Sequence, residues 1–184
     1  MAEFQAANTR SPATTAVPMP SPVWDPPFAS MFKLKVDASV AVNTYLVGVG
    51  IVISDGFGRV RAAGTMKFTA FFTPLVTKAI AILYGVWLAF DSGFLPILME
   101  SNALCVINVL KEGSVLCSDL GLVIYDIFHV CCCLNILSFS FIPRVVNKVD
   151  DAIAKVALSS VSDSFWTKSC PHLLELLVQE DFPS

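Results

Sequence analysis

Charged side chains are scarce in this chain. Asp, Glu, Lys and Arg make up 15% of its 184 residues, and the formal net charge is -3; about a quarter is usual in soluble domains. A protein that holds nucleic acid mainly through phosphate contacts usually carries a basic surplus. Because this chain has none, its composition does not favour tight, sequence-independent binding of nucleic acid, although local basic patches remain open.

Long apolar runs are also missing, although hydrophobic residues make up 55% of the chain. The longest uncharged runs, 38–54 and 127–143, are shorter than the roughly 18 residues expected of a spanning helix. We therefore interpret both runs as buried elements and expect no membrane span. The N-terminus lacks the apolar core of a signal peptide.

The chain has no C-x-x-C pair, so a zinc knuckle or a redox motif is not indicated. Three of its six cysteines, Cys131, Cys132 and Cys133, are consecutive, and their side chains point in different directions, which is poor geometry for one metal. We expect buried, reduced thiols in an intracellular protein, in either the cytoplasm or the nucleus.

The length fits one domain with a substantial core. Residues 1–22 are rich in Ala, Thr, Ser and Pro without an apolar period, and we expect a disordered N-terminal tail there. The domain itself is expected over residues 23–178, followed by a short C-terminal tail over 179–184.

Hydrophobic periodicity predicts nine elements in the order β-β-β-α-β-α-α-β-α. Strands are expected near 32–39, 45–54, 59–69, 95–100 and 134–142, and helices near 74–90, 102–111, 120–130 and 147–160. Asn102 is expected to cap the second helix. Trp87, inside the first and most apolar helix, is expected in the core. This order predicts an α/β fold, a mixed five-stranded sheet with helices on both faces.

Asp37 is the most informative single residue. Leu34, Val36 and Ala38 alternate with polar neighbours, which is the pattern of a half-buried strand, and Asp37 lies within that strand. A carboxylate there is costly to remove from water unless a partner or a metal compensates it. The strand therefore indicates an acid-based site.

Several motifs, in this order and spacing, resemble one known family, the ribonuclease H-like, reverse-transcriptase-like domains of plants that derive from retroelements. The resemblance covers roughly residues 24–177. It is carried by Trp24-x-Pro26-Pro27, the stretch 32–39, the stretch 48–55 with Gly58, Ala81-Ile82-Leu83-x-Gly85-x-x-Leu88-Ala89, Glu100-Ser101-Asn102 and Pro143-Arg144-Val145-Val146-Asn147. It implies a ribonuclease H-like fold, Mg²⁺-dependent hydrolysis of RNA–DNA hybrids and nucleic-acid binding.

The resemblance also implies four active-site positions, which the family fills with Asp, Glu, Asp and a final Asp or His. They fall on Asp37, Lys78, Asn102 and Asp151. Two of the four carboxylates are thus replaced, and the formal charge of the set is -1 in place of -4. Two Mg²⁺ ions need that negative charge to activate water and stabilise a leaving oxygen. We therefore predict that catalysis has degenerated and that a two-metal site is not retained.

Alternatives remain open at this stage. Lys78 is expected to form an ion pair with Asp37 or Asp151, or else to contact a phosphate. One weakly held metal at Asp37, Asp151 and Glu100 is a further alternative. The chain could also be an active, metal-dependent hybrid endonuclease, or a protein-interaction module that docks on a partner through its apolar first helix.

Overall fold

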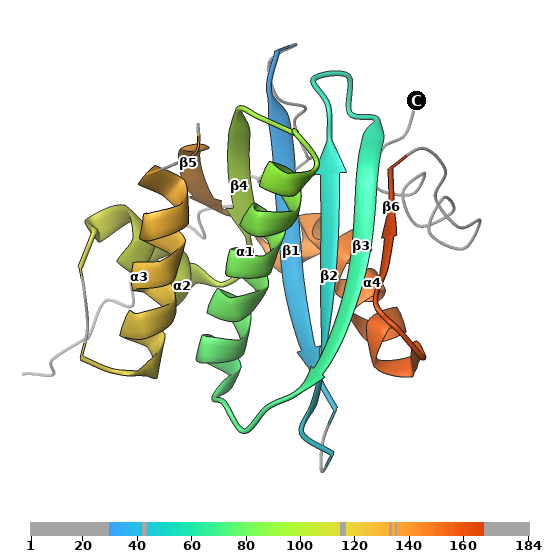
Figure 1. Cartoon of the computed structure of the whole chain (residues 1–184), viewed down its shortest axis with the longest axis vertical. Helices are drawn as coiled ribbons and strands as arrows, with labels where there is room; N and C mark the ends of the chain where they lie inside the picture. The colour runs from blue at the N-terminus through green and yellow to red at the C-terminus, as the bar shows by residue number, and fades with distance from the viewer. Residues whose placement is uncertain (1–29, 42–43, 115–116, 133, 135, 168–184) are drawn as a thin grey trace, which may run out of the picture.

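The computed structural model describes residues 30–41, 44–114, 117–132, 134 and 136–167 (Figure 1). The expected tails at 1–22 and 179–184, Trp24, Cys133 and Cys170 lie outside the described residues. The elements are β1 Phe32–Val40, β2 Leu46–Ser54, β3 Val60–Thr69, α1 Pro74–Asp91, β4 Ile97–Ser101, α2 Leu104–Glu112, α3 Asp119–Cys132, β5 Ile136–Phe141, the 3₁₀ turn η1 Arg144–Val146, α4 Lys148–Ser159 and β6 Ser164–Trp166.

The strands form one mixed sheet in the order β5-β4-β1-β2-β3-β6. The pairs β1/β2, β2/β3 and β3/β6 are antiparallel, and the pairs β1/β4 and β4/β5 are parallel. The predicted α/β class and element order are confirmed as far as α4. The predicted number of strands is one too low, because β6 adds itself to the edge of β3, with Gly64 opposite Phe165. A three-residue strand after the last helix has too short a pattern to show in the sequence.

Helices cover both faces of this sheet, as predicted (Figure 1). The helix α1 packs on β1 and β2, and α3 and α2 pack against α1 on the same side. Among the described α-helices, α4 is the one on the opposite face, against β1, β2 and β3. The main apolar core lies under α1, and a smaller cluster of Val52, Ala63, Val149 and Ile153 lies under α4.

Glycines allow both helices to approach the sheet closely. A Cβ on Gly85 of α1 would lie 2.5 Å from Val36 Cγ1, and a Cβ on Gly50 of β2 would lie 2.2 Å from the Asp150 carbonyl oxygen on α4. Real Cβ atoms do not tolerate such contacts. The glycine at position 50 therefore fixes how close the start of α4 comes to β1 and β2.

The strand β1 is buried on both faces, so the expectation of a half-buried strand is wrong. Leu34 and Val36 face α1 and are 0% exposed, while Lys35 and Asp37 on the other face are only 2% and 3% exposed. The polar residues suggested a solvated face, but α4 covers that face. The charges that the sequence places on β1 are therefore buried charges.

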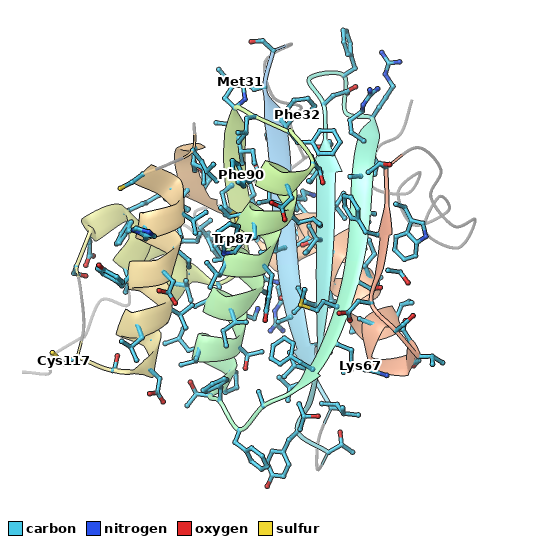
Figure 2. The ribbon with its side chains drawn as sticks, in the orientation of Figure 1. Met31, Phe32, Lys67, Trp87, Phe90 and Cys117 are labelled. Atoms are coloured by element: carbon cyan, nitrogen blue, oxygen red, sulfur yellow. The ribbon has the colours of Figure 1, made fainter. Side chains whose placement is uncertain are left out.

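Two expectations about exposure are also wrong. Cys105, Cys117 and Cys132 are exposed and Cys131 is half-buried, because α2 and α3 form the outer layer on their side of the sheet. Trp87 is 44% exposed, because only one side of α1 contacts the sheet (Figure 2). By length and composition alone, α1 is also apolar enough to cross a membrane, a criterion that core helices meet equally; eight of its residues are buried in the domain.

Candidate active site around Asp37

The register of the two central parallel strands brings Asp37 and Asn102 together. Val36 of β1 lies beside Ser101 of β4, so Asp37, the next residue of β1, lies beside the point where β4 ends and Asn102 follows. The first turns of α1 are aimed at this edge as well: Thr73 caps the helix by accepting a hydrogen bond from the Val76 N–H, and Lys78 follows one turn later. The end of β4 and the start of α1 therefore converge on Asp37, which lies within β1.

The Asp37 carboxylate is fully engaged by the protein itself. Its Oδ1 accepts a hydrogen bond from the Ala38 N–H at 2.7 Å and lies 3.2 Å from Lys78 Nζ. Its Oδ2 accepts hydrogen bonds from Asn102 Nδ2 at 2.8 Å and from Asn147 Nδ2 at 3.3 Å. The expected ion pair of Lys78 is thus formed, and its partner is Asp37.

A further contact joins Lys78 and Asn102, the two positions at which the family resemblance implies replaced carboxylates. Lys78 Nζ also donates a hydrogen bond to Asn102 Oδ1. The ammonium of Lys78 therefore bridges the carboxylate of Asp37 and the amide oxygen of Asn102. A metal ion at this place would be a cation held between oxygens of these two residues. Here the cation between them is the ammonium of a side chain.

Asn102 does not cap α2, which corrects the prediction. The residue before α2 is Ala103, and no side chain caps the helix. The Asn102 amide is instead used completely by Asp37 and Lys78. A charged donor gives a stronger hydrogen bond than a helix N–H, so Asn102 Oδ1, the atom that would cap the helix, accepts from the Lys78 ammonium instead.

Asn147 is a site residue that sequence reasoning missed. It lies between η1 and α4, is 0% exposed, and donates to Asp37 from the far side of the sheet. The only sequence signal was its place at the end of the 143–147 motif, directly before the last helix. In the sequence this motif indicates the family resemblance and a helix start, and it gives no sign of a contact with Asp37.

The remaining predicted ligands do not join Asp37. Asp151 has a side chain that is 44% exposed and lies 2.5 Å from Lys155 one turn later on α4. Glu100 points its carboxylate at Lys33, with Oε1 2.8 Å from Nζ. Among the described residues, no three His, Cys, Asp or Glu side chains form a group that could hold a metal ion.

The residues present do not fit a two-metal centre. Asp37, the one predicted carboxylate ligand that lies at the convergence point, is neutralised by an ammonium at 3.2 Å and has hydrogen bonds on both oxygens. A divalent cation would have to displace Lys78 and would meet its repulsion, worth about 4 kcal/mol per unit charge at 4 Å and an effective dielectric near 20. The four side chains stabilise one another, and the oxygens of Asp37 already accept hydrogen bonds from the chain, so they are not available as metal ligands.

Comparison with known proteins gives the family. A family model described as reverse transcriptase-like matches residues 35–157, more than half of the chain. The chain belongs to the reverse transcriptase-like family. No curated protein sequence matches it significantly.

Solved structures show the same fold at low sequence identity. Ribonuclease H1 from the halophilic archaeon Halobacterium salinarum has a TM-score of 0.65 and 22% identity, over 70% of this chain and 98% of that one. LC11 ribonuclease H1, in complex with an RNA/DNA hybrid, has a TM-score of 0.62 and 19% identity, over 70% of this chain and 96% of that one. The N-terminal ribonuclease H domain of a Mycobacterium tuberculosis protein has a TM-score of 0.62 and 16% identity, over 70% of this chain and 94% of that one. The chain therefore has a ribonuclease H-like fold.

Proposed function

We propose that this reverse transcriptase-like domain is hydrolytically silent and serves as a nucleic-acid-binding module. The observation that carries the proposal is the Lys78 ammonium, which lies 3.2 Å from Asp37 and donates to Asn102. Phosphodiester hydrolysis on two metals needs ions that activate the water and stabilise the leaving oxygen. With Lys78 placed between the two positions, the protein supplies one fixed positive charge and no metal-bound water.

An ammonium cannot replace the metals in this chemistry. It can attract a phosphate oxygen, but it does not lower the pKa of a bound water as a divalent ion does. The side chain of Lys78 is also committed, because it already satisfies a carboxylate that is 3% exposed. Hydrolysis by this site would first require that a buried ion pair be broken, which leaves Asp37 uncompensated.

Nucleic-acid binding is supported by the family and by one structural neighbour, LC11 ribonuclease H1, which is in complex with an RNA/DNA hybrid. The low charge of this chain determines how strongly we expect it to bind nucleic acid. With a net charge of -3, few phosphates can be neutralised, so we expect weak binding with a shallow dependence on salt.

The test is a paired assay on one labelled RNA–DNA hybrid of about 16 base pairs. Fluorescence anisotropy measures binding at several salt concentrations, and a denaturing gel measures cleavage with Mg²⁺ and with Mn²⁺. We expect saturable binding that weakens as salt rises, and no cleavage above that of an Asp37→Ala control. Cleavage that Asp37→Ala abolishes would show an active nuclease, and absence of salt-dependent binding would refute the nucleic-acid role.

A further inference from the structure

A cavity of about 320 Å³ lies between α1 and the outer strands β3 and β6, and Trp87 is one of its lining residues. This is within the size range of small-ligand sites. None of Asp37, Lys78, Asn102 or Asn147 lines it, so it is separate from the candidate active site.

Three elements build the walls. On α1, Tyr84, Trp87, Leu88 and Asp91 are spaced so that they share one side of the helix. On β6, Phe165 stands opposite Gly64 of β3. A Cβ at Gly64 would lie 3.1 Å from Leu88 Cδ2 and 3.4 Å from Phe165 Cδ2. Because glycine has no side chain, no atom projects from this position into the space between Leu88 and Phe165.

The aromatic rings of the cavity are more exposed than core residues. Trp87 is 44%, Tyr84 38% and Phe165 38% exposed. Large aromatic side chains left in water around a concave space are costly to keep there unless a ligand or partner covers them. The faces of such rings carry partial negative charge, which attracts cations within about 6 Å of the ring centre.

Two carboxylates on the rim of the cavity also attract cations. Asp91 ends α1 and Asp163 precedes β6, and both line the cavity. Within the described part of the chain, no Lys or Arg side chain lies within ion-pair distance of either one. Asp163 Oδ1 accepts a hydrogen bond from the Lys67 N–H at 2.8 Å, which fixes the carboxylate at the rim.

We propose that this cavity binds a small organic cation that carries an alkylated ammonium group. Three rings and two carboxylates attract a positive charge, whereas an anion would be repelled and a neutral apolar molecule would leave the carboxylates unused. An alkylated ammonium is weakly hydrated and fits against rings better than a bare ammonium does. Asp163, Ser164 and Phe165 lie beyond the segment 35–157 that the family model matches, so part of the wall is outside that match.

The experiment uses the full chain with two probes of equal shape, choline and its neutral isostere 3,3-dimethylbutan-1-ol. Binding is measured by calorimetry and by shifts of the indole N–H signals in NMR spectra. We expect choline to bind about tenfold more tightly than the isostere, since one cation–π contact of moderate strength gives a factor of that order. Equal binding of both probes, or no saturable binding of choline, overturns the proposal.

Variants locate the site. Asp91→Asn with Asp163→Asn keeps the shape and one acceptor oxygen of each side chain, and is expected to remove most of the preference for choline over the isostere. Trp87→Phe is expected to weaken choline binding severalfold and to remove the shifted indole signal. Asp126→Asn, an exposed change on α3 that removes one negative charge far from the lining residues, is the surface control and should bind as the parent does. Thermal unfolding shows that each variant is folded; folded cavity variants that bind choline like the control refute the site.

Discussion

Lys78 Nζ lies 3.2 Å from Asp37 Oδ1, and this ion pair occupies the point where β1, β4, α1 and the start of α4 meet. Asp37 is buried, while 19% of the Lys78 side chain is exposed. The carboxylate predicted to be a metal ligand is therefore neutralised by a residue of the chain. The contribution of this ion pair to stability and its effect on metal binding can both be measured.

Replacement of Asp37 by Asn is expected to lower the free energy of unfolding by about 3 kcal/mol. The change leaves the Lys78 ammonium without its counter-charge and removes the strong acceptor shared by Asn102 and Asn147. Urea denaturation monitored by circular dichroism measures it. The exposed Asp126→Asn is the control, with an expected change below about 0.5 kcal/mol. An unchanged midpoint for Asp37→Asn would show that the network contributes no stability.

The ion pair itself can be isolated by a double-mutant cycle of Asp37→Asn and Lys78→Met. We expect a coupling free energy of about 1–3 kcal/mol, because each single change leaves one charged partner uncompensated and the double change leaves none. The same urea titrations supply all four values. Strict additivity of the two single changes would contradict a direct interaction between the side chains.

Gly50→Ala is expected to destabilise the domain by about 3 kcal/mol, since the new Cβ would lie 2.2 Å from the Asp150 carbonyl oxygen and 2.6 Å from the Ala154 nitrogen. The helix α4 would have to move away from β2 and would draw Asn147 from Asp37. Gly93→Asn is the control: its position has φ +73, which Asn tolerates, and nothing lies within 4 Å of the added Cβ. Similar losses in the two variants would contradict close packing at Gly50.

The cysteines of α2 and α3 should differ sharply in reactivity. Burial, reinforced by the neighbouring Cys132 thiol, raises the pKa of Cys131 from 9.0 to about 12. At neutral pH this leaves Cys131 with about a thousandfold less thiolate than a thiol of pKa 9.0, whereas Cys105, Cys117 and Cys132 are exposed.

Timed alkylation with iodoacetamide, read by peptide mass spectrometry, should label those three cysteines first and Cys131 last. Because its pKa is raised, the Cys131 rate should keep increasing with pH up to about 12. Labelling of Cys131 at the rate of Cys132 in the folded chain would contradict its burial.

The sequence predicted the element order and an ion pair of Lys78 with either Asp37 or Asp151, because motif spacing and strand period are local signals that tertiary structure preserved. It did not predict which sides of elements face water. Trp87 lies in a helix that is apolar nearly all round, so the side that meets the sheet could not be chosen from composition. The alternation on β1 predicted a half-buried strand, yet α4 covers the polar face as well, and the Lys35 ammonium there donates to the Val146 carbonyl oxygen at 2.7 Å.

The candidate active site also combines features that the sequence predicts with contacts that it does not. Asn102 has the right residue type and place for a helix cap, and only the distance to Asp37 and Lys78 decides against that role. Asn147 contacts Asp37 across 110 residues of sequence, a pairing that a single sequence does not encode locally. Contacts that depend on how closely α4 approaches the sheet therefore had to come from the structure.

The most direct test of the central claim is a calorimetric titration of Mg²⁺ into the chain and into the double variant Lys78→Glu, Asn102→Asp. If Lys78 stands where the cation belongs, the natural chain shows no saturable Mg²⁺ binding, and the double variant, with two further carboxylates beside Asp37, binds Mg²⁺ and is stabilised by it. Saturable Mg²⁺ binding by the natural chain, lost on Asp37→Asn, would contradict the account.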